Sequence, residues 1–169
     1  MSRVLVAGIG NIFLGDDGFG VEVAQRLGGR PVPDGARVED FGIRGVHLAY
    51  ELLEGYDVLV LIDAMPIGEP PGTVTLLEPE VDVTDGGDGE VPVLEAHSMS
   101  PAVVLDLVAG LGGQVDRVLI VGCEPATTDE GIGLSPPVAA AVGPAVDAVA
   151  QLLAEVCAPA HSNRREANP

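Results

Sequence analysis

Residues 4–20 have the sequence VLVAGIGNIFLGDDGFG, which predicts a strand, a tight loop and the start of a helix. The first residues, Val-Leu-Val-Ala, are apolar and favour a buried strand. The glycines that follow allow sharp turns and a close approach of the backbone to its neighbours. Apolar residues then recur at helical spacing from Val21 to Leu27. Asp16 and Asp17 are therefore expected where this helix begins.

Two adjacent carboxylates at a helix start have two explanations. A carboxylate in the first turn faces unpaired backbone N–H groups and the positive end of the helix dipole, so Asp16 or Asp17 would serve as a helix cap. One aspartate is enough for a cap, and this interpretation gives the second no structural role. A cation-binding role therefore stays open beside the capping role.

Neither of the common phosphate-binding glycine loops fits this stretch. A P-loop needs a lysine after its second glycine, but Gly15 is followed by Asp16, and the chain contains no lysine. The dinucleotide fingerprint needs a glycine where Phe13 stands, and a pyrophosphate would share the helix start with two carboxylates. These mismatches disfavour a dinucleotide-dependent oxidoreductase, and the crowded negative charge favours a cation over a phosphate.

Composition favours a single α/β domain. A chain of 169 residues suits one domain, and its hydrophobic fraction of 47% with only 3% aromatics requires a core of Val, Leu, Ile and Ala. Such a core is typical of parallel strands covered by helices on both faces. A net charge of −18 repels phosphate groups, so we expect neither nucleic acid nor an anionic membrane as a partner.

The cysteines and the apolar segments indicate a compartment. Cys123 and Cys157 form no Cys-x-x-Cys motif, and Cys123 is expected to be a small buried hydrophobe. The sequence shows no signal-peptide pattern and no uninterrupted apolar run long enough for a bilayer. We therefore expect a reduced, cytoplasmic, monomeric protein.

The rest of the chain alternates predicted strands and helices. Strands are expected at 36–41, 56–64, 73–77 and 115–122, and helices at 46–54, 101–111 and 136–156. Flanking prolines indicate that 73–77 is an edge strand, and the acidic segment 78–95 is expected to be a flexible loop. The pattern predicts one α/β domain over residues 1–156, a three-layer α/β/α arrangement with a mostly parallel central sheet of about five strands. Residues 157–169 are expected to be a disordered tail.

Several side chains that suit a metal ion follow these predicted elements. Ligands of open α/β sheets bind beyond the carboxyl ends of the strands, where Asp17, Asp40 and Asp63 would gather. His97, just before the helix at 101–111, is either a cap or a further ligand. Oxygens from Asp17 and Asp63 with a nitrogen from His97 would suit nickel, zinc or manganese. The alternative is a set of unrelated caps and turn residues, and His47 is expected to be a surface or packing residue.

The sequence resembles the hydrogenase maturation proteases from Met1 to about Glu155. The resemblance is carried, in order, by GIGN at 8–11, DD at 16–17, Gly20, LIDA at 61–64, His97 and GIGLSP at 131–136. It implies a single-domain α/β endopeptidase. Such an enzyme removes a C-terminal extension from the large subunit of a nickel-iron hydrogenase after nickel insertion.

The resemblance also implies roles for particular residues. Asp17, Asp63 and His97 correspond to the metal site, and Asp40 to a further functionally important acid. The nickel would belong to the partner, a nickel-loaded large-subunit precursor, and the resting protease would hold no tight metal. Clustered carboxylates repel each other unless a cation lies between them, which would favour the loaded precursor.

The chemistry of cleavage has open alternatives. A carboxylate, Asp17 or Asp40, that activates water is the simplest aspartyl-type scheme. Residues 41–45, Phe-Gly-Ile-Arg-Gly, depart from the Gly-Thr that often follows the acid in this family. An alternative function is a nickel-binding accessory or sensor protein that uses the same residues and cleaves nothing.

Overall fold

The computed structural model describes residues 2–79 and 101–158. Its elements, in chain order, are β1 (Val4–Ile9), the 3₁₀ helix η1 (Gly15–Gly18), α1 (Phe19–Gly28), β2 (Ala36–Gly42), α2 (Gly45–Leu52), β3 (Val58–Ala64), β4 (Val74–Leu77), α3 (Pro101–Gly110), β5 (Arg117–Cys123) and α4 (Pro136–Val156). From residue 80 on, the acidic segment 78–95 lies outside the described residues, as does the predicted tail from residue 159 on.

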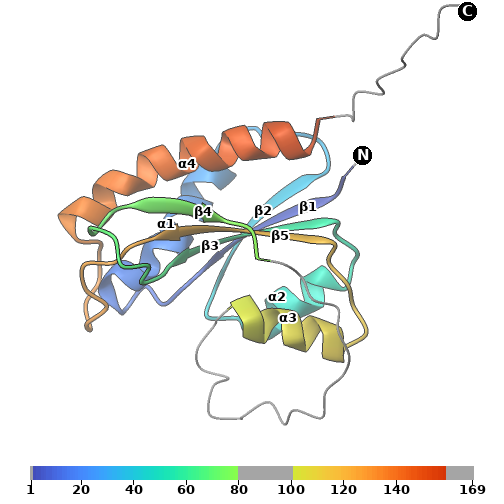
Figure 1. The fold of residues 1–169 in the computed structure, drawn as a ribbon, viewed down its shortest axis with the longest axis horizontal. Helices are drawn as coiled ribbons and strands as arrows, with labels where there is room; N and C mark the ends of the chain where they lie inside the picture. The colour runs from blue at the N-terminus through green and yellow to red at the C-terminus, as the bar shows by residue number, and fades with distance from the viewer. Residues whose placement is uncertain (1, 80–100, 159–169) are drawn as a thin grey trace, which may run out of the picture.

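The five strands form one sheet in the order β2-β1-β3-β5-β4 (Figure 1). β1 pairs in parallel with β2 and β3, and β3 pairs in parallel with β5. β4 lies at one edge and runs antiparallel to β5. The predicted mostly parallel sheet, with 73–77 at its edge, is confirmed.

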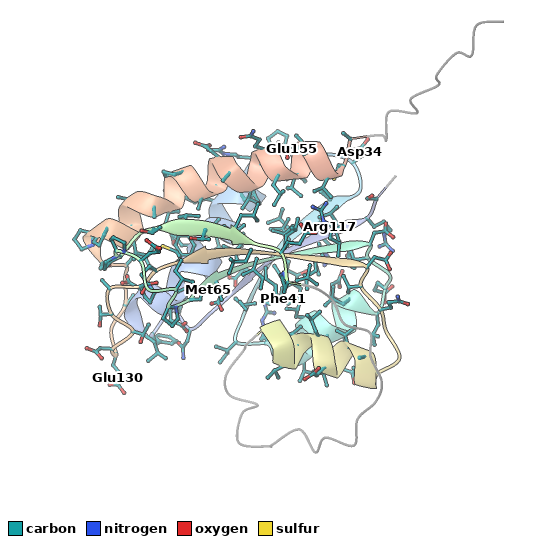
Figure 2. The ribbon with its side chains drawn as sticks, in the orientation of Figure 1. Asp34, Phe41, Met65, Arg117, Glu130 and Glu155 are labelled. Atoms are coloured by element: carbon teal, nitrogen blue, oxygen red, sulfur yellow. The ribbon has the colours of Figure 1, made fainter. Side chains whose placement is uncertain are left out.

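Helices cover both faces of the sheet. Figure 1 shows α1 and α4 on one face and α2 and α3 on the other. Alternate residues of the central strands feed two apolar clusters: Val60 and Ile62 of β3 belong to the α1/α4 cluster, and Leu61 to the α2/α3 cluster. Figure 2 labels Phe41, a fully buried side chain of the α2/α3 cluster. The predicted three-layer α/β/α domain is therefore confirmed.

Helix α4 has the bounds that its apolar periodicity predicts. By length and composition alone, this 21-residue helix is also long and apolar enough to cross a membrane, although polar residues interrupt its apolar sequence. Its apolar residues, however, pack in the α1/α4 cluster, where Val138, Val142, Val146 and Val149 are almost completely buried. Packing against the sheet accounts for its composition.

Candidate functional site

A close contact between α1 and the sheet sets the geometry of the site. A Cβ atom at Gly20 would lie 2.1 Å from the carbonyl oxygen of Ile62 and 2.5 Å from that of Ile9. Only glycine permits this approach, because the clashing atoms belong to the backbone. The start of α1, with the η1 turn before it, is thus held directly against the carboxyl ends of β1 and β3.

Asp17 is fixed by the loop that follows β1. Its Oδ2 accepts a hydrogen bond of 2.7 Å from the backbone N–H of Asn11. Gly10 has a φ of +135°, and a Cβ atom there would lie 1.9 Å from the carbonyl oxygen of Asp17. The loop therefore wraps tightly around the turn that carries this carboxylate.

Asp63, near the end of β3, responds electrostatically to Asp17. Burial and, to a smaller extent, repulsion by the Asp17 carboxylate raise the pKa of Asp63 to about 8, while a hydrogen bond from the Ala64 backbone opposes the shift. Asp63 thus holds a proton near neutral pH. A cation placed between the two carboxylates would displace this proton and remove the repulsion.

Asp40 does not join this pair. Asp40 and Ile62 both pair with Gly8 of β1, so their side chains share the α1/α4 face of the sheet. Asp63 follows Ile62 and lies on the opposite face. The Asp40 Oδ2 instead accepts a hydrogen bond of 3.1 Å from Nε2 of Gln25 in α1. Asp17, Asp40 and Asp63 thus lie at the same edge of the sheet, as expected. Of these three carboxylates, Asp17 and Asp63 interact with each other, and Asp40 interacts with neither.

A groove of about 300 Å³ opens beside Asp40. Apolar side chains at its rim are solvent-exposed, with exposed fractions of 46% for Ile12, 59% for Phe13 and 65% for Ile43. Arg44 also lines the groove, but its guanidinium donates hydrogen bonds to the carbonyl oxygens of Asp40 and Phe41. The groove therefore combines an apolar rim with a carboxylate, next to the strand ends.

Asp16 has a role that the sequence did not reveal. It is 0% exposed, and its carboxylate accepts hydrogen bonds from the backbone N–H groups of Ala126, Thr127 and Ser135 and from the Ser135 hydroxyl. Helix α1 begins only at Phe19, with no side-chain hydrogen bond at its cap. Of the two explanations for the adjacent aspartates, a helix cap on α1 therefore does not apply, and both carboxylates accept hydrogen bonds from the loops around η1.

The other predicted site residues are placed as follows. His97 lies outside the described residues. Over 2–79 and 101–158, no group of three or more His, Cys, Asp or Glu side chains is arranged to hold a metal ion. Cys123 is fully buried, and burial is the main cause that raises its pKa to about 11, which confirms it as a buried hydrophobe. His47 is exposed on α2, as expected for a surface residue.

Known proteins share both the sequence and the fold of this chain. Residues 21–152 match a family model described as hydrogenase maturation protease. The chain is 33% identical over 162 residues to hydrogenase expression/formation protein HupD of Bradyrhizobium diazoefficiens, covering 91% of this chain and 79% of that protein. It is 32% identical to hydrogenase 2 maturation protease of Escherichia coli, covering 90% of this chain and 92% of that protein. The solved structure of hydrogenase maturating endopeptidase HybD from Escherichia coli has a TM-score of 0.72 and 32% identity, over 91% of this chain and 93% of that one.

Proposed function

Because the chain belongs to the hydrogenase maturation protease family, we propose that it removes the C-terminal extension of a nickel-iron hydrogenase large-subunit precursor after nickel insertion. Its relatives are named as maturation proteases and endopeptidases, so the chain is a peptide-bond hydrolase. In this proposal the nickel is cargo of the substrate. Asp17, Asp63 and His97 recognise it.

The pairing of Asp17 with Asp63 carries the proposal. Their repulsion makes the resting site unfavourable for two negative charges, as the raised pKa of Asp63 indicates. A precursor that brings a divalent cation relieves this repulsion and gains affinity. A nickel-free precursor gains none, so the same two carboxylates discriminate between the substrates.

The path of the chain supports His97 as the third ligand. Helix α3 lies on the α2/α3 face of the sheet, the face that Asp63 shares with Leu61 (Figure 1). Its last residues lead to the start of β5, so its first residue, Pro101, lies toward the carboxyl ends of the strands. His97 precedes Pro101 by four positions in the sequence. An imidazole from this segment would complete a mixed oxygen and nitrogen ligand set that suits nickel.

Hydrolysis requires a base for water. In the proposed reaction a carboxylate takes a proton from water while the water oxygen attacks the scissile carbonyl carbon, and the proton passes to the departing nitrogen. Asp17 and Asp40 are the two candidates for this base. Asp17 lies beside the nickel-recognising carboxylate, and Asp40 lies in the groove that suits an extended peptide.

The test is processing of a large-subunit precursor, nickel-loaded in one sample and nickel-free in another, followed by mass spectrometry. We expect loss of a short C-terminal peptide from the loaded sample only. Cleavage of both samples would contradict the nickel requirement. Cleavage of neither, combined with tight nickel binding by the isolated protein, would instead support a nickel-binding accessory or sensor.

The same assay tests the ligand assignment. Asp17→Ala, Asp63→Ala and His97→Ala are each expected to abolish processing while the fold is retained, as judged by circular dichroism and thermal unfolding. Normal cleavage by any two of these variants would refute the proposed recognition site. Asp40→Asn tests the alternative base: retained cleavage would leave Asp17 as the remaining candidate.

A further inference from the structure

A carboxylate is buried one residue before Asp17, outside the proposed nickel-recognition site. The Oδ2 of Asp16 accepts hydrogen bonds from Ala126 N at 2.8 Å, Thr127 N at 3.1 Å and Ser135 Oγ at 2.8 Å. Its Oδ1 accepts one from Ser135 N at 2.7 Å. Both carboxylate oxygens are therefore used within the protein, and Asp16 has no exposed surface for a ligand.

This burial calls for an explanation other than stability. Removing a carboxylate from water is costly, and a buried charge with good partners often stabilises a fold no more than apolar residues would. Such a charge nevertheless fixes geometry, because its donors must converge on two oxygen atoms. The arrangement around Asp16 therefore points to a requirement for position.

The donors come from one segment, residues 124–135, which joins β5 to α4. Backbone hydrogen bonds fasten the same segment to the turn: Gly131 N donates to Phe13 O at 2.9 Å, Gly15 N to Gly131 O at 2.9 Å, and Asp16 N to Thr127 O at 3.0 Å. Figure 2 shows Glu130, in the middle of this segment, at a point where the segment extends away from the sheet. The segment and the η1 turn thus form one connected unit.

The geometry of η1 connects this unit to Asp17. A 3₁₀ helix has about three residues per turn, so consecutive side chains point about 120° apart. With Asp16 directed into the segment 124–135, Asp17 is directed toward Asn11, whose N–H it accepts, and close enough to Asp63 to repel it. Any rotation of the turn that released Asp16 would also move Asp17.

We infer that Asp16, held by Ser135, is a positioning residue for peptide cleavage, which fixes the orientation of the Asp17 carboxylate without touching the substrate. This inference has two parts. That Asp17 belongs to the cleavage site rests on the proposed function, whereas the orientation of Asp17 by Asp16 does not. The inference does not depend on which carboxylate is the base. The geometric part, control of Asp17 by Asp16, can be measured without substrate.

Two variants and a matched control test the inference. Asp16→Asn preserves the size of the side chain but points an amide nitrogen at hydrogen-bond donors, and Ser135→Ala removes one of the donors while leaving the carboxylate in place. Leu153→Ala opens a cavity in the core at the far end of α4, about 27 Å along the helix from Ser135. Thermal unfolding establishes which variants have comparable drops in Tm.

The first readout is hydrogen exchange at the Asn11 N–H, which the Asp17 carboxylate protects. We expect protection at Asn11 to fall by about tenfold in Asp16→Asn, and less in Ser135→Ala, beyond any change shared with the amides of β3. Leu153→Ala is expected to lower protection in β3 and at Asn11 alike. Unchanged relative protection at Asn11 in both test variants would overturn the inference, whatever the enzyme cleaves.

The second readout is cleavage of the nickel-loaded precursor well below each Tm. Asp16→Asn should lower kcat/KM by at least about tenfold, because it misplaces the Asp17 carboxylate, which the proposed function assigns to nickel recognition and to the cleavage site. Leu153→Ala should cleave at the wild-type rate. Equal losses in Asp16→Asn and Leu153→Ala at matched Tm would show a merely structural role and overturn the inference. If the wild type cleaves no precursor, the proposed function fails, and the exchange experiment alone decides the positioning role.

Discussion

Asp16 and Asp63 are carboxylates at the same edge of the sheet, but their surroundings shift their pKa values in opposite directions. Burial alone would raise the pKa of Asp16, but hydrogen bonds from Ser135, Thr127 and Ala126 together lower it. At Asp63, burial and repulsion by Asp17 act in the same direction and raise the pKa to about 8. Converging donors fix the Asp16 carboxylate in one position, whereas a carboxylate that faces another carboxylate has the charge environment that a cation would relieve.

The largest expected effect is the loss of cleavage when either carboxylate of the Asp17 and Asp63 pair is replaced. Asp17→Asn and Asp63→Asn should each lower the cleavage rate by at least about 10³-fold, because an amide neither attracts a cation strongly nor accepts a proton from water. The rate is measured by mass spectrometry with nickel-loaded precursor. Asp147→Asn is a matched control, since Asp147 forms only an exposed ion pair with Arg30. A control as inactive as the two test variants would contradict a specific role for the pair.

The next effect concerns stability at Asp16. Asp16→Ala leaves buried donors of Ala126, Thr127 and Ser135 without an acceptor, and should lower the free energy of unfolding by about 3–5 kcal/mol. Since the folded-state pKa is lowered, the carboxylate stabilises the fold above about pH 5 and loses this effect as the pH falls below about 3.9. The difference between variant and wild type in urea unfolding should therefore shrink in acid. A difference that is constant from pH 3 to pH 7 would contradict this account.

At Asp63 the sign is reversed. The folded protein holds a proton that the unfolded chain releases, so Asp63 lowers stability progressively as the pH rises from about 4 to about 8. Asp63→Asn removes this titration and should raise the free energy of unfolding at pH 8 by about 3–5 kcal/mol, with little change at pH 4. Denaturant unfolding at both pH values checks the prediction. An equal change at the two pH values would contradict the raised pKa.

The smallest effect tests a single contact of Asp16. Ser135→Ala removes the hydroxyl donor at 2.8 Å but keeps the backbone donor of the same residue. The free energy of unfolding should fall by about 1.5–3 kcal/mol, the usual range for a hydrogen bond to a charged group. Thr73→Val is the control, because its hydroxyl donates to Pro70 O in an exposed turn. A larger loss in the control would contradict the importance of burial.

Much of the fold follows from local patterns in the sequence. The apolar run at 56–64 predicts β3, and the apolar periodicity at 136–156 predicts α4 with the observed bounds. These signals are sufficient because a buried parallel strand and a core helix are defined by neighbouring residues. Helix α2 shows the limit, since it spans Gly45–Leu52 where 46–54 was expected.

The site was only partly predictable. The sequence predicts that Asp17 and Asp63 share a sheet edge, because both follow strands that run in the same direction. It does not predict the partners of Asp16, which lie 110 to 119 positions further along the chain. Nor does it place Asp40 on the face opposite Asp63, because the face depends on the register between β1, β2 and β3.

The long separation between Asp16 and its donors also has a consequence in time. Synthesis proceeds from the N-terminus, so β1, η1 and α1 leave the ribosome well before residues 126–135 do. Until then the Asp16 carboxylate lacks the four hydrogen bonds that compensate for its burial. The turn that carries Asp17 can therefore reach its final geometry only late in translation, after residues 126–135 have emerged.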